Sequence, residues 1–462
     1  MRSIFLILVP FLTFLAGVPA SATGFKLKSL IPIDAGARSV AVADLNHDGN
    51  MDLAVASEES NSTVSVLLGK GNGSFQPQMR YPVGSFPYGV AAADVNLDGY
   101  VDLVVTNEAA ATMSVLLGNG DGTFQAQRVS PTQDQPFQVA VGDFNGDGIP
   151  DAVTASIPVG LSLGNGDGTF QSPINIYAVG GYSIGLGDFD ADGNLDLAIG
   201  TNLGSAGSVQ ILLGQGDGTF KTGGAYSLQV ATAFSLAVGD LNHDGKLDIV
   251  ATTFDPGVDV LLGNGDGTFT APAVYPMTCS SYGITIADFN RDGNPDLAAG
   301  DFCVPSLVSV FTGNGNGTFQ PAMEYSAEGN SAVAVVALDL NNDGSPDLVV
   351  ASNGASSPLA VLINTGGTLM RTTSSANPSK VGQKVTFTTQ VKQSVPGTGT
   401  PSGTVKVKDG TKVLGTANLV NGKASFSTST LAQGTHRILG SYSGDANFNP
   451  NSAEPLVQVV NP

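Results

Sequence analysis

The sequence predicts an all-β protein in which a seven-bladed β-propeller is followed by an immunoglobulin-like (Ig-like) β-sandwich. Two observations predict the propeller. An aspartate-rich segment recurs seven times with a period near 50 residues, and a glycine-rich segment recurs between its copies. A period of that length is the size of one four-stranded propeller blade. The third observation predicts the sandwich, because about the last hundred residues lose the repeat and alternate apolar with polar residues between Gly, Pro and Asn turns.

Each repeat is predicted to form four strands. The aspartate-rich segment, DLNHDGNMDLAV in its first copy, recurs at intervals of 45 to 52 residues. Its copies begin at Asp44, Asp94, Asp143, Asp188, Asp240, Asp288 and Asp339. The glycine-rich segment ends at Phe75, Phe124, Phe170, Phe220, Phe269 and Phe319. In the second repeat we expect strands at Gly89–Ala93, Leu103–Thr106 and Ser114–Leu117, and a fourth strand from Phe124.

The seventh repeat lacks a fourth strand, and the N-terminal part of the chain is predicted to supply it. Each closing phenylalanine precedes the first aspartate of the next repeat by 18 to 20 residues, and Phe25 precedes Asp44 by 19. We therefore expect Phe25–Ile33 to form the outer strand of the seventh blade. Closing the ring in this way removes the exposed sheet edges of an open array.

The predicted domains are a signal peptide over residues 1–22, the propeller over 23–366 and the Ig-like domain over 367–462. Arg2, an apolar run over 4–16 and the small residues Ala20-Ser21-Ala22 follow the pattern of an export signal. An uncleaved membrane anchor is the alternative, and Pro10 and Thr13 disfavour it because they interrupt an already short run. We expect a secreted or cell-surface protein with no membrane span after cleavage.

The charge of the chain excludes two classes of partner. The formal net charge is −20 and the sequence pI is about 4.2, which argues against binding to nucleic acid or to an anionic membrane. The predicted Ig-like domain has the opposite sign, because residues 368–462 contain nine basic and three acidic side chains.

The repeated motifs resemble a known family. The aspartate loop and the G-x-G-D-G-T-F turn resemble FG-GAP or VCBS-type repeats, which are related to the N-terminal propeller of integrin α subunits. This resemblance covers residues 25–366. The run from GTPSGTVKVKDG to GSYSGDANF resembles bacterial Ig-like repeats, although it lacks the cysteine pair and the Trp of antibody domains.

The aspartate loops are predicted calcium sites. Each has the form D-x-[DN]-x-D-G-x-x-D, with side-chain oxygens at positions 1, 3, 5 and 9 and a sharp turn at the glycine of position 6. Hard oxygen donors at alternate positions, together with the position-7 carbonyl, are what Ca²⁺ requires. A plain Asp/Gly turn without metal is the alternative, but three carboxylates would repel one another in an empty turn.

We expect about seven structural Ca²⁺ ions, with the tightest at the fourth loop because Asp190 adds a further carboxylate. The expected ligands, in loop order, are Asp44, Asn46, Asp48, Asn50, Asp52; Asp94, Asn96, Asp98, Tyr100, Asp102; Asp143, Asn145, Asp147, Ile149, Asp151; Asp188, Asp190, Asp192, Asn194, Asp196; Asp240, Asn242, Asp244, Lys246, Asp248; Asp288, Asn290, Asp292, Asn294, Asp296; and Asp339, Asn341, Asp343, Ser345, Asp347.

A possible ligand-binding face lies opposite these loops. Six residues before each loop, five of the seven repeats carry an aromatic residue, namely Tyr88, Phe137, Tyr182, Phe234 and Tyr282. In integrins the corresponding face carries aromatic rings that hold a basic side chain of a partner, so the resemblance implies a mouth for a cation, a peptide or a sugar. The alternative is that the rings pack between blades. Cys279 and Cys303 belong to this face of the sixth blade, either as a disulfide or as two small buried residues.

The leading interpretation is an exported recognition or adhesion module that binds a protein or a glycan. We do not expect an enzyme, because the sequence contains no nucleophile elbow, HExxH, CxxC or Walker motif. One alternative is a carbohydrate-active lyase or hydrolase, with a paired-carboxylate site that includes Glu58 or Glu59. The other is a passive structural component.

Overall fold

The structure of the chain is a computed structural model. It describes residues 24–462 except 59–61, 204–205, 229–231, 355–357, 366–367, 394–399, 446–447, 449–450 and 454. The predicted signal peptide and Glu59 lie outside the described residues, and the domain boundaries remain predictions. The described residues contain no helix long and apolar enough to cross a membrane.

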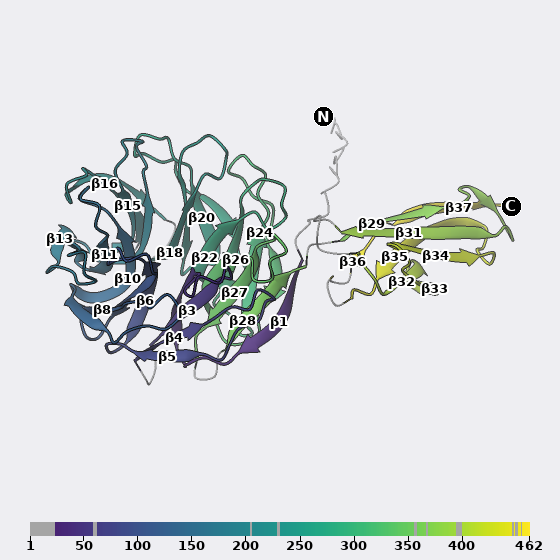
Figure 1. The fold of residues 1–462 in the computed structure, drawn as a ribbon. Helices are drawn as coiled ribbons and strands as arrows, with labels where there is room; N and C mark the ends of the chain where they lie inside the picture. The colour runs from purple at the N-terminus through teal and green to yellow at the C-terminus, as the bar shows by residue number, and fades with distance from the viewer. Residues whose placement is uncertain are drawn as a thin grey trace, which may run out of the picture.

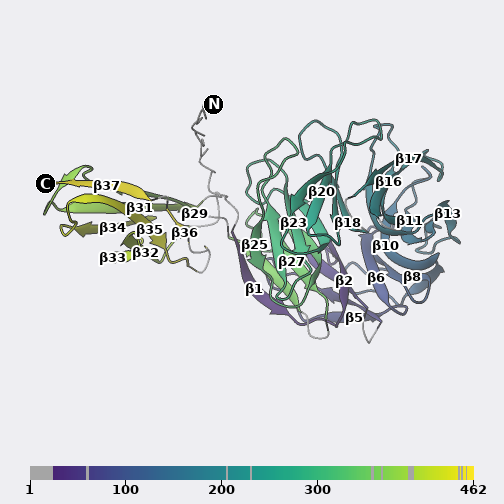
Figure 2. The same ribbon diagram turned by 180° about the vertical axis from the view of Figure 1, so that it is seen from behind.

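Seven four-stranded antiparallel sheets are arranged in a ring (Figures 1 and 2). From the inner to the outer strand, blade 1 is β2 (Ala37–Ala43), β3 (Asp52–Ser57), β4 (Thr63–Leu67), β5 (Met79–Pro82); blade 2 is β6 (Pro87–Ala93), β7 (Asp102–Asn107), β8 (Thr112–Leu116), β9 (Arg128–Pro131); and blade 3 is β10 (Asp134–Gly142), β11 (Asp151–Ile157), β12 (Val159–Ser162), β13 (Ile174–Tyr177). Blade 4 is β14 (Gly181–Gly187), β15 (Asp196–Leu203), β16 (Ala206–Gly214), β17 (Phe220–Ser227); blade 5 is β18 (Ala233–Gly239), β19 (Asp248–Thr253), β20 (Gly257–Leu261), β21 (Ala273–Pro276); and blade 6 is β22 (Ser281–Ala287), β23 (Asp296–Asp301), β24 (Leu307–Phe311), β25 (Met323–Ser326).

Blade 7 is built from both ends of the propeller. Its inner strands are β26 (Ala332–Leu338), β27 (Asp347–Ser352) and β28 (Leu359–Asn364), and its outer strand is β1 (Phe25–Ile31). The register places Phe25 opposite Asn364 and Ile31 opposite Leu359. Since β1 comes before blade 1 in the sequence, this pairing closes the ring. The predicted fold class, a seven-bladed propeller, is confirmed.

The hydrophobic core of the propeller lies between the faces of neighbouring blades. The second strand of each blade is buried on both faces, which explains its nearly continuous run of apolar residues. Between blades 1 and 2, for example, Ala54 and Val64 pack with Val90 and Leu103. The outer strands β5 and β25 alternate half-buried and exposed residues because one face meets solvent.

One predicted strand start is wrong by four residues, whereas the other predicted strand ends lie within two residues of the observed ones. The fourth strand of blade 2 was expected from Phe124, but β9 begins at Arg128. Phe124 instead forms an isolated bridge with Gly118 that ends the turn. Its ring is buried against Tyr81 of blade 1, edge to face at 5.4 Å. The aromatic residue therefore closes the turn and fills the space between two blades before the outer strand starts.

The second domain is a β-sandwich, as predicted. One sheet contains β29 (Thr368–Ser374), β31 (Val385–Gln393) and β34 (Lys423–Thr428), and the other contains β30 (Ser379–Lys380), β37 (Leu456–Asn461), β35 (Gly434–Tyr442), β32 (Thr404–Asp409), β33 (Lys412–Asn418) and β36 (Asn451–Ser452). Its core includes Phe387, Ile438 and Phe448, all fully buried. The domain projects from one side of the ring (Figure 1), where the Lys26 ammonium donates to the Asp445 carbonyl at 2.8 Å.

Candidate functional site: the aspartate loops and the aromatic collar

The seven aspartate loops share one local conformation, as loop 1 illustrates. One Asp44 carboxylate oxygen accepts from the Asp48 amide at 3.1 Å, and the other accepts from the Gly49 amide at 2.9 Å. Gly49 has φ +84°, and nothing lies within 4 Å of a Cβ placed on it. The glycine is therefore required for its backbone conformation rather than for space. His47 at position 4 also has a left-handed φ of 58°.

The aspartate at position 9 has a second structural role. In loop 1, the Leu45 amide donates to one carboxylate oxygen of Asp52 at 2.9 Å, and the Gly69 amide donates to the other at 2.6 Å. Asp52 thus joins its own loop to the end of the third strand of the blade. The seven position-9 side chains, all 0% exposed, are Asp52, Asp102, Asp151, Asp196, Asp248, Asp296 and Asp347.

Burial raises the pKa of these position-9 carboxyls, although two backbone amides oppose the shift. The pKa of Asp52 rises to about 6, that of Asp296 to about 7 and that of Asp347 to about 8. The charges of the other aspartates in the same loop raise these pKa values further. A nearby cation would act in the opposite direction, because it would favour the ionised carboxylates.

The residues of loop 4 fit a hard cation. In loop 4, carboxylate oxygens of Asp188, Asp190 and Asp196 all lie within 4.8 Å of one another, the one such group of three found among the described residues. In loop 1 the residue at position 3 is Asn46, whose amide donates to Asp48 at 3.1 Å. Asp190 cannot donate in this way once ionised. The donor set of loop 4 is therefore the most anionic of the seven, and tighter binding of Ca²⁺ there stays a prediction.

The five predicted aromatic residues form a continuous collar around the central channel, one from each of blades 2 to 6. Neighbouring ring centroids lie 4.1 to 6.4 Å apart, and the series runs Tyr88, Phe137, Tyr182, Phe234, Tyr282. The rings therefore contact one another across blade boundaries. The sequence did not predict that Phe302 extends the collar from Tyr282, at 4.7 Å.

Arg38 completes the collar in blade 1. Its guanidinium lies over the Tyr88 ring at 5.3 Å, and its Nε donates to Glu58. Burial alone would lower the pKa of Arg38, but the hydrogen bond and the Glu58 charge raise it, so the side chain stays cationic. Burial and the Glu58 charge raise the pKa of Glu108, while Arg38 lowers it, so these three groups influence one another. The chain's own cation thus occupies a place on the aromatic rings where a partner's basic group was expected.

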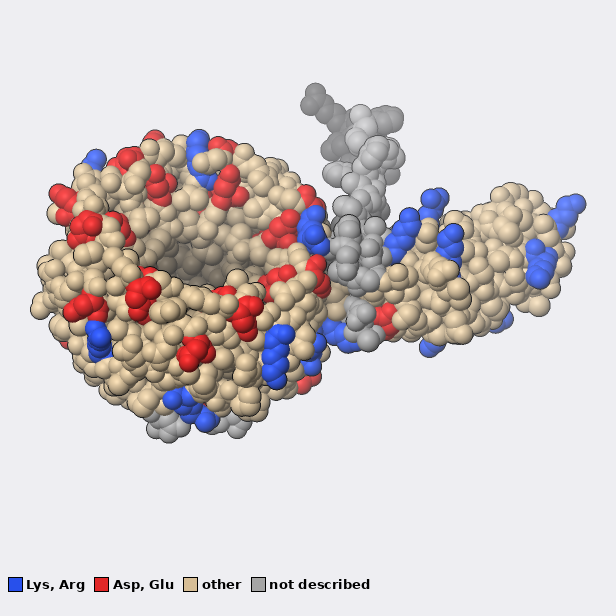
Figure 3. All heavy atoms as spheres, viewed as in Figure 1, with Lys and Arg blue, Asp and Glu red and all other residues tan. Residues whose placement is uncertain are grey.

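A cavity of about 170 Å³ opens inside this collar. Strands of six blades line it, and the polar or aromatic residues involved are Arg38, Ser39, Tyr88, Gln138, Phe234, Ser235 and Tyr282. Burial raises the pKa of Tyr88 to about 12, so its hydroxyl stays protonated. Figure 3 shows one face of the molecule, on which acidic side chains surround a hollow at the centre of the ring and basic side chains are spread over the smaller domain.

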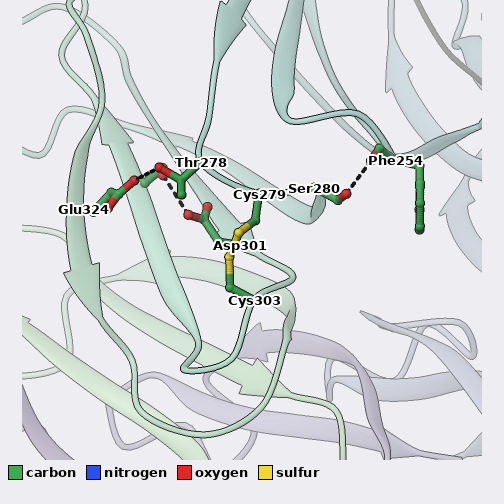
Figure 4. Close-up of a disulfide and its surroundings, with 8 residues drawn as sticks. Phe254, Thr278, Cys279, Ser280, Asp301, Cys303 and Glu324 are labelled. Carbon is green, nitrogen blue, oxygen red and sulfur yellow. Dashed lines mark hydrogen bonds between the residues drawn. A yellow bond between two sulfur atoms is a disulfide. The ribbon is translucent and has the colours of Figure 1, made fainter.

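Cys279 and Cys303 form a disulfide that joins two loops of blade 6 (Figure 4). One loop precedes β22 and the other follows β23, and Phe302 of the collar is the immediate neighbour of Cys303. Nearby, Asp301 is fully buried, and burial raises its pKa to about 7. The disulfide therefore fixes the part of the collar formed by blade 6.

The fold and the repeated loops define a propeller of aspartate-loop repeats that carries an Ig-like domain. The FG-GAP-like repeat family matches at residues 44–105, 94–154, 188–251, 240–299 and 301–350, and the bacterial Ig-like domain (group 3) matches at 372–461. The repeat matches span more than half of the chain, which belongs to the FG-GAP-like repeat family. Neither description names an enzymatic activity. A comparison with curated protein sequences finds no match.

Solved structures share the propeller fold. BBS1N in complex with ARL6DN, from crystals soaked with mercury, is 13% identical with a TM-score of 0.52, and the match covers 74% of this chain and 97% of that one. The same complex soaked with lead is 12% identical with a TM-score of 0.53, covering 75% and 98%. At such identities the likeness extends to the fold alone.

Proposed function

We propose that this protein is an exported, calcium-stabilised recognition or adhesion module that binds its ligand at the mouth of the channel. The observation that carries the proposal is the cavity inside the aromatic collar. Six blades contribute to it, so the closed ring creates a site that no single repeat contains. Concave sites lined by aromatic residues with a few convergent polar groups are the usual form of a ligand site.

Calcium would have a structural role in this proposal. The oxygens at positions 1, 3, 5 and 9 would hold one ion in each loop, and the bound ion would neutralise carboxylates that otherwise repel one another. Since the position-9 aspartate also joins two strands of its blade, an ion in the loop would stabilise that junction. Each bound ion adds stability by mass action, about 1.4 kcal/mol at ten times its dissociation constant.

The proposed location outside the cell rests on two features of the chain. The N-terminal residues follow the pattern of an export signal, and Cys279 is bonded to Cys303, which is common in oxidising compartments. A protein partner is one candidate ligand, since a propeller of the same fold, BBS1N, has been crystallised in complex with ARL6DN. A glycan is the other.

Glycan and peptide arrays, probed with the full chain in the presence of calcium and again after chelation, test this function. We expect binding that depends on calcium and that falls when Tyr282 is replaced by Ala. The matched control is Tyr275→Ala, because Tyr275 lies in the outer strand β21 of the neighbouring blade. Binding that is unaffected by the Tyr282 substitution would place the ligand elsewhere and refute the proposal.

A carbohydrate-active enzyme is the second candidate, and one observation favours it. Arg38, Glu58 and Glu108 converge at the mouth, and the raised pKa of Glu108 suits a general acid. In contrast, the pKa of Tyr88, near 12, makes this phenol a poor base for a lyase. Incubation of the array-positive glycans with the protein tests this candidate, with Glu108→Gln as the inactive variant. Release of no product over many hours would exclude it.

A further inference from the structure

We infer that the mouth of the propeller binds a neutral sugar residue, a single pyranose ring at the end of a glycan. This inference rests on the proposed function, since it names the class of ligand for the same cavity. It follows from three properties of the cavity: its size, the polar groups left without partners, and the charges at its rim.

The cavity has the size of one six-membered ring. Its volume is about 170 Å³. A cavity of about 150 Å³ accommodates one benzene molecule. A folded peptide or a second sugar ring would have to remain outside the collar, and the ligand would enter by its terminal residue.

The polar groups in the cavity wall are suited to a ligand whose own groups both donate and accept hydrogen bonds. In the part of the chain that the structure describes, the hydroxyls of Tyr88, Tyr282 and Ser235 make no hydrogen bond, although all three residues line the cavity. Gln138 accepts from the Ile184 amide at 3.2 Å, which leaves its own amide hydrogens for a ligand. Sugar hydroxyls donate and accept at once, so one ring can pair with several of these groups.

The guanidinium of Arg38 presents further donors. Arg38 lines the cavity, and its Nε donates to Glu58, so its two terminal nitrogens have no hydrogen-bond partner among the described residues. The Glu58 carboxylate, linked to the same guanidinium, offers acceptors beside these donors. A donor and an acceptor side by side match two neighbouring hydroxyls of a sugar.

Groups of both signs lie close together at the rim, and each disfavours a ligand of its own sign. A cationic ligand would meet Arg38, which already lies over the Tyr88 ring at 5.3 Å. An anionic ligand would meet Glu58 and Glu108, both close enough to influence Arg38 and each other. A ligand without net charge avoids both repulsions and can pack its apolar face against the edges of the Phe234 and Tyr282 rings, which line the cavity and stack on each other with centroids 4.1 Å apart.

Ligand-observed NMR with the full calcium-loaded protein tests the inference. The probes are the methyl glycosides of glucose, galactose, mannose and N-acetylglucosamine as neutral sugars, methyl glucuronoside as the anion, and methyl glucosaminide and an arginine-containing tripeptide as cations. We expect at least one neutral glycoside to bind, with the charged probes at least about tenfold weaker.

Single-atom variants connect that binding to the mouth. Tyr88→Phe and Tyr282→Phe each remove one hydroxyl and should weaken the neutral sugar about 3- to 10-fold, as the loss of one hydrogen bond does. Tyr275→Phe, the same change outside the cavity, should leave binding unchanged. Glu108→Gln removes one negative charge and keeps a side chain of similar size. It should therefore reduce the difference in affinity between methyl glucuronoside and the neutral sugars.

The outcomes separate this inference from the function on which it rests. If a charged probe binds more tightly than every neutral sugar and Tyr282→Phe weakens it, the mouth is a ligand site but not a neutral-sugar site, and this inference is wrong. If no probe and no array ligand responds to the Tyr88 or Tyr282 variants, the proposed function fails as well.

Discussion

Removal of the disulfide should lower the stability of the propeller by an amount that the structure allows us to calculate. Cys279 and Cys303 are separated by 24 residues. Closing a loop of that length lowers the entropy of the unfolded chain, which raises the free energy of unfolding by about 3.5 kcal/mol at 25 °C. The propeller, about 340 residues from Phe25 to Asn364, should unfold with an entropy near 0.7 kcal/mol per kelvin. The double substitution Cys279→Ser and Cys303→Ser should therefore lower Tm by about 5 °C.

The assay is calorimetry of the wild type and the double variant, each with and without a thiol-free reductant. Both cysteines are only partly buried, so the reductant can reach them. Reduction should lower the Tm of the wild type by the same amount as the substitution and leave the double variant unchanged. A variant that melts within about 1 °C of the oxidised wild type would refute the reasoning, because the loop would then be constrained by other contacts.

Three further predictions concern calcium, ring closure and pH. Chelation with EDTA should lower the propeller Tm in calorimetry, and added Ca²⁺ should restore it, whereas added Mg²⁺ should not; a Tm insensitive to EDTA would contradict the calcium proposal. Asn364, at the end of β28, donates to the carbonyls of Phe289 at 2.7 Å and Pro346 at 3.0 Å. Asn364→Ala should therefore lower the free energy of unfolding of the propeller, measured in urea, by about 1–3 kcal/mol. An unchanged midpoint would show that other groups satisfy these carbonyls. His436 has a raised pKa because it pairs with the Ala432 carbonyl and the Asp409 carboxylate, so its contribution to Ig-like domain stability should be present at low pH and disappear as pH rises through its folded-state pKa. His436→Gln should remove that dependence from the calorimetric profile, and a profile that the substitution leaves unchanged would exclude this cause.

The propeller could be predicted from the sequence because each blade repeats the same local rules. The glycine at position 6 of every loop has a positive φ, near 80 to 91°, so the motif specifies a turn wherever it occurs. The spacing from Phe25 to Asp44 placed β1 next to the seventh repeat because a ring has a fixed number of strands per blade. The start of β9 was misplaced because sequence alone does not reveal that Phe124 packs on Tyr81 of another blade.

The collar was partly predictable for a related reason. Its five aromatic residues recur at one position of the repeat, and periodicity finds such residues. The pairing of Arg38 with Glu58 could not be found in this way, because Arg38 lies in β2, Glu58 follows the end of β3, and the two share no repeated pattern. The aspartates at position 9 show a second limit of the sequence. Their positions could be predicted from the repeat, but their role could not, because a buried carboxylate that joins two strands and one that binds a cation have the same sequence signature.

Since β1 pairs with β28, the order of the strands in space differs from their order in synthesis. The first strand of the ring to be made has no partner until more than three hundred residues later, when Leu359–Asn364 is made. During that interval six blades can form by local pairing, but the seventh cannot. The pairing that closes the ring is therefore the last to become available during synthesis, because it joins the two ends of the propeller. Any event that detaches β1, such as cleavage just after Ile31, would expose one edge of β28 and reopen the structure at that point.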